Sequence, residues 1–182
     1  MNPLIRLSSA ILLAPMNPSS TVHSHGCSTH FFSFDGPYEI VPQFKNAALQ
    51  GAQESIDIVT VLVVQVHRHP VFFIDVKPSA SLAYDSRREA ADEQMRRRFR
   101  DLRQILTIPI LHGISAFGTQ LSFYEYDSAS QVLKPPRVLH PNSDLLADVV
   151  PMTRWDCDVL HPVGANRLRN IVDQVKEMCA QV

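Results

Sequence analysis

The sequence predicts an α/β (α+β) domain in which a mixed central β-sheet is flanked by helices. Two observations lead to this fold class. Apolar, β-branched runs come in groups, which is typical of strands, whereas two later segments repeat apolar residues at helical spacing. The predicted order is three strands, a helix, two strands, a loop and a helix. Grouped strands with helices packed on the sheet are typical of this class.

The chain has 182 residues, of which 45% are hydrophobic, so one domain with its own core is expected. We divide it into an irregular N-terminal arm over residues 1–36, with room for a short helix, and a single domain over residues 37–182. The apolar run at residues 10–14 is too short to span a bilayer. The three cysteines are few and odd in number, which favours a reducing compartment over a disulfide framework. We therefore expect an intracellular protein, cytoplasmic or nuclear, with no membrane partner.

The strand predictions follow the apolar runs in order. Pro42 confines the first run, over residues 38–44, to a sheet edge or a strand end, because proline cannot donate to the ladder. Residues 58–66 are β-branched and almost continuously apolar, which is typical of a strand buried on both faces. The remaining strands are expected over residues 71–77, 110–117 and 121–127.

Two segments have helical periodicity. Apolar residues from Tyr84 to Leu106 form one stripe, and the sequence SRRE at residues 86–89 fits a capping box that starts a helix near Arg87. The stripe from Leu168 to Val182 predicts a second amphipathic helix. The Pro-rich segment before it, over residues 134–155, is interpreted as an excursion from the regular fold.

The strand over residues 71–77 carries two charges for which a core strand has no packing reason. Asp75 and Lys77 are two residues apart, so in a strand both side chains point to one face. Buried charges are normally paired or bind a metal ion. The pattern therefore indicates either a plain ion pair on an exposed sheet face or a functional site. The functional site is favoured because Asp57 opens the preceding strand and a helix that carries Gln94 follows.

This set of side chains suits phosphodiester hydrolysis. Two carboxylates close together can hold a hard divalent cation, Mg²⁺ or Mn²⁺, which polarises a phosphate and activates water. A lysine beside the ion can orient or deprotonate that water. The candidate catalytic residues are therefore Asp57, Asp75, Lys77 and Gln94.

The same residues resemble the PD-(D/E)XK nuclease superfamily, in which a strand-borne Asp precedes an acid-x-Lys on the next strand and a helix follows. The matches are Asp57, then residues 75–77 (DVK), then Gln94. The wider run from Tyr38 to the C-terminus, including FFIDVKP and LHGISAFGTQLSFYEYD, resembles a fungal group of nuclease-like proteins of unassigned activity in that superfamily. The resemblance implies a restriction-endonuclease-like core and Lys77 near the attacking water. It also implies a metal ion held by Asp57, Asp75 and the backbone carbonyl of Val76.

The chain departs from the family pattern upstream of these residues. The family often has an acid on a helix before the first core strand. Here the nearest acids are Glu39 and Glu54, and neither lies in an obvious predicted helix.

The strand register is a second departure. If residues 67–70 form a four-residue turn, Asp75 pairs with Leu62, which is five residues from Asp57. Five is odd, so a regular ladder turns Asp57 to the opposite face of the sheet. A bulge, or a turn placed nearer Val66, would bring the two acids together.

Arginines gather on the predicted helix after the strand pair. The formal net charge is −1, so an attraction to nucleic acid must come from such a local patch. The candidate nucleic-acid-binding residues are Arg87, Arg96, Arg97 and Arg98. The alternative is a solvated helix face on which arginines have i,i+4 partners such as Asp92.

Metal-capable side chains also occur in the N-terminal arm, at His23, His25, Cys27 and His30. No second paired cluster accompanies them, so a His-rich arm is the favoured interpretation. The leading hypothesis for the chain is metal-dependent hydrolysis of nucleic acid, with DNA favoured as partner and a homodimer as a compatible state. The alternative is a catalytically inactive nuclease-like fold that acts as a nucleic-acid or protein interaction module. A weaker alternative is that the chain is a regulatory appendage of a larger assembly.

Overall fold

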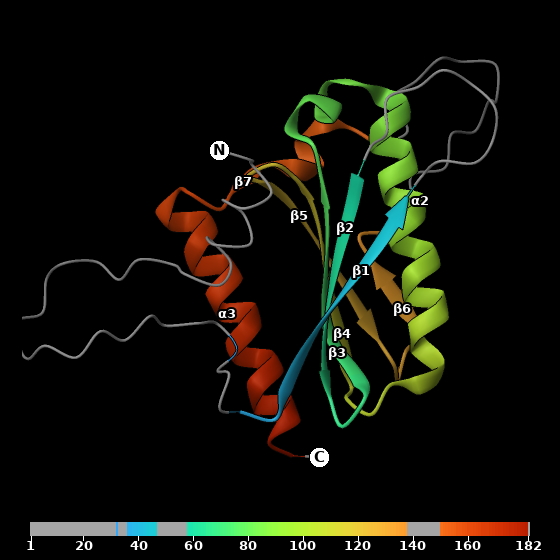
Figure 1. Ribbon diagram of the computed structural model, residues 1–182, viewed down its shortest axis with the longest axis vertical. Coiled ribbons are helices and arrows are strands. Elements are labelled where there is room, and N and C mark those ends of the chain that lie inside the picture. The colour runs from blue at the N-terminus through green and yellow to red at the C-terminus, as the bar shows by residue number, and fades with distance from the viewer. Residues whose placement is uncertain (1–31, 33–35, 47–57, 138–149, 182) are drawn as a thin grey trace, which may run out of the picture.

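A mixed sheet of seven strands lies between two long helices and forms the middle layer of the molecule (Figure 1). The computed structural model describes residue 32 and residues 36–46, 58–137 and 150–181. The strands are β1 (Tyr38–Asn46), β2 (Ile58–Val66), β3 (His69–Lys77), β4 (Ile110–Phe117), β5 (Gln120–Asp127), β6 (Val132–Lys134) and β7 (Cys157–Asp158). The helices are α2 (Asp85–Leu102) and α3 (Pro162–Cys179), with short 3₁₀ segments η1 (Ser79–Ala83), η2 (Arg103–Ile105) and η3 (Met152–Trp155). The expected mixed sheet with flanking helices is confirmed.

The strand order is β1-β2-β3-β4-β5-β6, and β7 pairs with the start of β5. Strands β3 and β4 are parallel, and the other neighbouring strands are antiparallel. A parallel pair needs a crossover connection, which α2 supplies. β1 is an edge strand, as expected from Pro42. No helix in the described part of the chain has the length and apolar character needed to cross a membrane.

The hairpin between β2 and β3 turns on two residues. His67 and Arg68 have φ values of 50° and 69°, and β3 begins directly after them at His69. A two-residue turn with positive φ matches the twist of the flanking strands. The expected four-residue turn over residues 67–70 is therefore wrong. The usual signals, Asn or Gly, are missing from this turn.

A β-bulge then resets the register of the hairpin. The pairing shifts between Val64 and Gln65, where β3 contributes an additional residue. Beyond the shift Asp75 pairs with Val61 rather than with the expected Leu62. Because side chains alternate along a strand, the bulge decides which residues of β2 share a face with Asp75.

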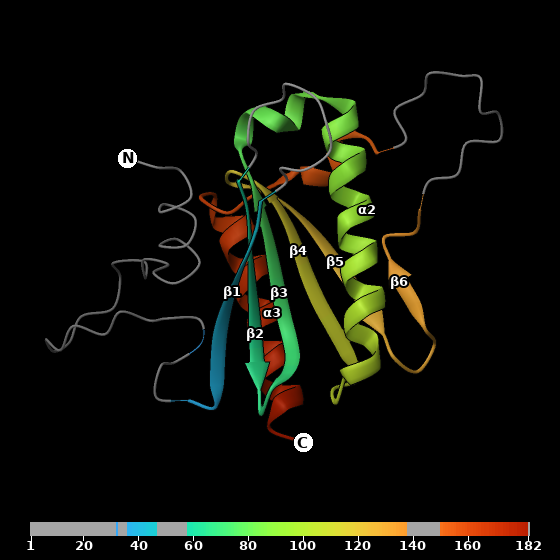
Figure 2. The same ribbon diagram turned by 45° about the vertical axis from the view of Figure 1, so that its right-hand side comes forward.

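The two helices cover opposite faces of the sheet (Figure 2). The core on the α3 face contains Phe72, Ile74, Val76, Ile114, Leu121, Leu168, Val172 and Val175, and Phe32 packs against it. The core on the α2 face contains Val63, Phe73, Met95, Phe99, Leu111, Tyr124 and Tyr126. Alternation places Asp75 and Lys77 on the same face as Phe73, beneath α2.

Helix α2 begins two residues before the expected start. Tyr84 is its N-cap and makes no side-chain capping bond, so the capping box predicted at residues 86–89 is wrong. The buried stripe of this helix contains Arg88, Ala91, Asp92, Met95 and Phe99. Two of these five residues are charged, and they lie against the sheet rather than in solvent.

Helix α3 is fixed at its start. His161 is the N-cap and its Nδ1 accepts a hydrogen bond from the Val163 amide, while Pro162 occupies the first turn, where its missing N–H is tolerated. A Cβ placed on Gly164 would lie 2.0 Å from the carbonyl oxygen of Asp158. Only glycine permits so close an approach of this helix to β7.

Candidate functional site

Asp75 and Lys77 form an ion pair under helix α2. The Asp75 Oδ1 and Lys77 Nζ atoms are 2.8 Å apart, and the two side chains are 2% and 8% exposed. Val76, between them, points to the α3 core. In the parallel partner strand, Ser115 lies opposite Asp75 and is fully buried. The predicted pair therefore exists, but as a buried pair and not on an exposed sheet face.

The pair is incompletely satisfied. Apart from their contact with each other, neither Asp75 Oδ1 nor Lys77 Nζ has a hydrogen-bond partner within the described residues. Burial lowers the pKa of Lys77, the charge of Asp75 opposes this effect, and the nearby Arg98 guanidinium adds to it. A buried ion pair offsets its desolvation cost fully only when further hydrogen bonds satisfy its remaining lone pairs and protons. This pair therefore has donor and acceptor capacity left for a further ligand.

Arg98 is the arginine that the structure brings to this pair. Its side chain is half-buried, and its Cζ atom lies 6.0 Å from the centroid of the Phe73 ring. Burial lowers the pKa of Arg98, and the charges of Asp75 and Asp101 oppose that lowering. Asp75 is thus flanked by two cations.

The other predicted residues of α2 lie in different surroundings. Gln94 and Arg97 are exposed, and Arg87 is half-buried near the start of the helix. The structure therefore does not place Gln94 among the buried groups around Asp75.

Several upstream candidates cannot be placed. Asp57, Glu54 and the His/Cys motif of the N-terminal arm lie outside the described residues. Glu39 is exposed on β1, and thus lies on an edge strand rather than on a helix. Within the described ranges, no group of three His, Cys, Asp or Glu side chains could hold a metal ion.

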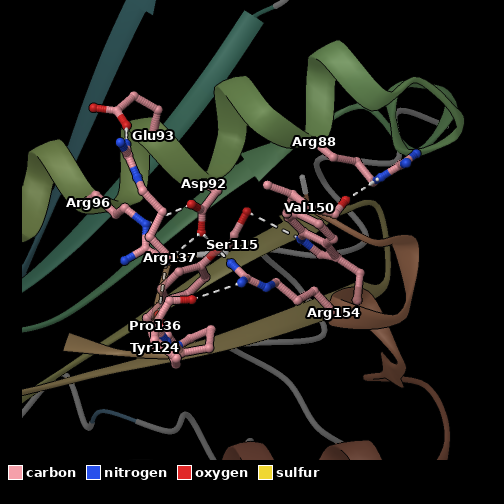
Figure 3. Close-up of polar contacts among 12 residues, drawn as sticks. Arg88, Asp92, Glu93, Arg96, Ser115, Tyr124, Pro136, Arg137, Val150 and Arg154 are labelled. Carbon is pink, nitrogen blue, oxygen red and sulfur yellow. Dashed lines mark hydrogen bonds and ion pairs between the residues drawn. The ribbon is translucent and has the colours of Figure 1, made fainter. Parts of the chain in front are cut away.

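A second buried polar cluster lies on the same face, centred on Asp92 (Figure 3). The Asp92 carboxylate accepts hydrogen bonds from Tyr124 at 2.8 Å, from Arg96 at 2.7 Å and from Arg154 at 2.7 Å. Burial and the Asp92 charge raise the pKa of Tyr124. The sequence had suggested Asp92 only as an i,i+4 partner of the arginines, and that pairing with Arg96 is confirmed.

This cluster, together with the nearby Arg88 on α2, also anchors the segments on either side of residues 138–149. Arg96 donates to the Pro135 carbonyl oxygen at 2.9 Å, and Arg154 donates to that of Pro136 at 3.0 Å. Arg88 donates to the carbonyl oxygen of Val150 at 2.9 Å. The Arg96 side chain is only 11% exposed, so its guanidinium is directed inward rather than to an external phosphate.

Sequence reasoning missed the role of Arg154 and the depth of Asp92. Arg154 is 62 residues from Asp92 in the chain, and no local pattern links them. A signal for Asp92 was present, because it lies in line with Arg88 and Met95 on the stripe that packs on the sheet.

Comparison with known proteins found no matching family model, no matching curated protein and no matching solved structure. The chemistry of the site must therefore be argued from its own atoms. A buried carboxylate beside an amine can hold a cation or position a water molecule.

Proposed function

We propose that this chain is a metal-dependent nuclease of the PD-(D/E)XK type that hydrolyses DNA phosphodiesters. The observation that carries the proposal is the Asp75–Lys77 pair, an acid and an amine 2.8 Å apart on one face near the end of β3. Such a pair has no packing role in an apolar core. The order of a strand hairpin followed by helix α2 is the order of elements on which the family resemblance rests.

The register of the hairpin adds support. Asp75 pairs with Val61, which is four residues from Asp57 in the sequence. Four is even, so continued alternation would turn Asp57 to the face of Asp75, but at about 13 Å from Val61 along a regular strand. The bulge thus removes the mismatch of the regular ladder.

The cation in this proposal is a hard divalent ion. Mg²⁺ is commonly bound by one or two carboxylates and keeps several waters, and Asp75, paired with Lys77 at 2.8 Å, is the described carboxylate at this position. Asp57, Asp75 and the backbone carbonyl of Val76 would hold the ion. Bound there, Mg²⁺ or Mn²⁺ would supply Lewis-acid polarisation of a phosphate.

The chain's own groups have distinct roles in this proposal. Lys77, whose pKa is lowered by burial, orients the attacking water and balances charge on the phosphate. Gln94, exposed on α2, borders the approach to the site. Arg87 and Arg97 contact the phosphate backbone, whereas Arg96 is engaged by Asp92.

The test combines metal binding with cleavage. We expect wild-type protein to bind Mn²⁺ in calorimetry and to cleave single- or double-stranded DNA, and Asp75→Asn to lose both, with cleavage reduced about a hundredfold or more. Asn keeps the shape of Asp, so a normal melting curve separates lost chemistry from lost folding. Asp173→Asn, an exposed acid on α3, is the matched control. Wild-type-like cleavage by Asp75→Asn would refute the proposal.

The burial of both charges favours a second candidate, the inactive interaction module. A pair that is 2% and 8% exposed resembles a structural ion pair more than an open active site. A ligand that binds only the folded state raises the melting temperature. If millimolar Mg²⁺ and Mn²⁺ shift the melting temperature of neither wild-type protein nor Asp75→Asn, the interaction module is supported over the nuclease.

A further inference from the structure

The turn that joins β2 to β3 has a backbone conformation that does not suit its residues. His67 and Arg68 have φ values of 50° and 69°, in the left-handed region that glycine and asparagine adopt at lower cost. Both side chains are exposed, so packing does not offset that cost. Residues held in such conformations cluster at functional sites. The stability of the turn therefore does not explain why His67 and Arg68 are present in it.

A hydrogen bond holds this turn against the end of helix α2. The Nδ1 atom of His69, the first residue of β3, is 2.9 Å from the carbonyl oxygen of Ile105 in η2. A carbonyl oxygen can only accept, so the Nδ1 atom carries the proton and donates it. The turn and the end of α2 thus lie at the same end of the molecule (Figure 2). This contact brings Arg68 and Arg103, the first residue of η2, to one surface.

This end of the molecule carries positive charge that is not neutralised internally. Arg68, Arg97 and Arg103 are exposed, and none of the three has an ion-pair partner among the described residues. The last turn of α2 also carries one exposed acid, Asp101. Three unpaired arginines against one acid leave a net positive surface. Such a surface attracts phosphate groups, because contact with them releases the counterions of a nucleic acid.

We propose that the His67–Arg68 turn and Arg103 form a contact site for the phosphates of a nucleic acid. An arginine guanidinium can donate two parallel hydrogen bonds to one phosphate. The strand from Arg68 to Asp75 spans about 23 Å at roughly 3.3 Å per residue, so this site is separate from the Asp75–Lys77 pair. The choice of nucleic acid as partner rests on the proposed function, whereas the contact itself needs neither a metal ion nor cleavage.

The double variant His67→Asn/Arg68→Gly tests the site, because it gives the turn its preferred residues and removes both side chains. We expect a higher midpoint of urea unfolding than in wild-type protein, together with weaker DNA binding. Binding to labelled single- and double-stranded DNA is measured by fluorescence anisotropy in EDTA, from about 50 to 200 mM salt. The affinity should fall about fivefold, and the slope of log affinity against log salt should shrink by about 0.9, the value for one phosphate contact on duplex DNA.

Two outcomes of this comparison would overturn the proposal. Unchanged affinity and slope would exclude a phosphate contact at the turn and would leave the surface to an acidic protein partner. A double variant that is less stable than wild-type protein would show that the two side chains serve the fold. Arg68→Lys keeps the charge and should retain most of the salt slope, whereas Arg103→Gln should lower the slope as the double variant does.

The chain offers a matched control for the backbone and one for the charge. Gln131 is exposed in the turn between β5 and β6 and also has a positive φ value, 57°. Gln131→Gly should stabilise the fold in the same way and leave DNA binding unchanged. Arg169→Gln removes one positive charge from α3, on the opposite face of the sheet, and should leave the salt slope unchanged. A loss in either control as large as that of the double variant would overturn the specific role of the turn.

Binding in EDTA and cleavage with Mn²⁺ separate this site from the proposed function. If wild-type protein binds DNA through the turn but does not cleave it with Mn²⁺, the nuclease fails and the contact site stands. If wild-type protein cleaves DNA and the double variant binds as wild type does, the contact site fails alone. If wild-type protein does not bind DNA in EDTA, the contact site is overturned, whatever the cleavage assay shows.

Discussion

The two faces of the sheet are both buried by a helix but differ in chemistry. The α3 face is packed by aliphatic and aromatic side chains, with His112 as its buried polar residue among those the structure describes. The α2 face also has an aromatic centre around Phe99. It additionally buries a larger polar set: Asp75, Lys77, Arg88, Asp92, Ser115 and Ser122.

This difference between the two faces distinguishes residues that serve packing from charged residues that packing does not require. The α3 face shows that this sequence can close one side of its sheet with apolar contacts, which stabilise by about 25 cal/mol per Å² buried. The α2 face keeps charges that a hydrophobic replacement would match or exceed in stability. Of its two polar clusters, the one at Asp92 is well hydrogen-bonded, whereas the one at Asp75 is not. The Asp75 cluster is therefore the better candidate for a site with a function other than stability.

The largest expected effect comes from breaking the Asp75–Lys77 pair. Lys77→Met leaves the Asp75 carboxylate buried without its closest cation, so we expect a loss of about 3–5 kcal/mol in the free energy of unfolding. The double variant Asp75→Leu/Lys77→Met should recover most of this loss, because it makes the α2 face resemble the α3 face. Urea unfolding measures both. A double variant as unstable as the single one would contradict the view that the pair is dispensable for packing.

A smaller but still substantial effect is expected at Asp92. Asp92→Ala leaves Arg96, Arg154 and the Tyr124 hydroxyl without their shared acceptor, and should cost about 3 kcal/mol. Lys134→Gln, which breaks the exposed pair with Glu125, is the control and should cost less than about 1 kcal/mol. Similar losses in the two variants, measured by thermal unfolding, would mean that the Asp92 cluster is not a structural anchor.

The sequence predicted most of the sheet because local apolar, β-branched runs mark its strands. The run at residues 58–66 is observed as β2 with the same bounds, and Pro42 marked the edge strand. The hairpin turn was misplaced because His67 and Arg68 adopt positive φ without the usual glycine or asparagine. The bulge near Val64 was named as a requirement for the site, but its position depends on packing that no local pattern records.

The sequence predicted the candidate site only in part. Alternation alone placed Asp75 and Lys77 on one face, and the structure adds that this face is buried under α2. The sequence named both Gln94 and Arg98 as candidate residues on one helix, yet Arg98 is half-buried near Asp75 and Gln94 is exposed. A helical wheel gives angles around the axis, but the depth of each side chain depends on how the helix lies on the sheet.

The smallest expected effect comes from loss of the Tyr124–Asp92 hydrogen bond, which tests whether Tyr124 acts through the Asp92 cluster or only by packing in the apolar core. Tyr124→Phe removes one hydrogen bond to Asp92 and should cost roughly 1 kcal/mol at pH 7. The folded-state pKa of Tyr124 is raised by burial and by Asp92, above the unfolded value of about 10. Between these two pKa values the folded state binds more protons, so the contribution of Tyr124 is present below pH 10 and falls as the pH rises further. The stability difference between wild-type protein and Tyr124→Phe should therefore shrink from pH 8 to pH 11 in urea unfolding. A difference that stays constant would mean that Tyr124 acts only by packing, as the aromatic residues of the α3 face do.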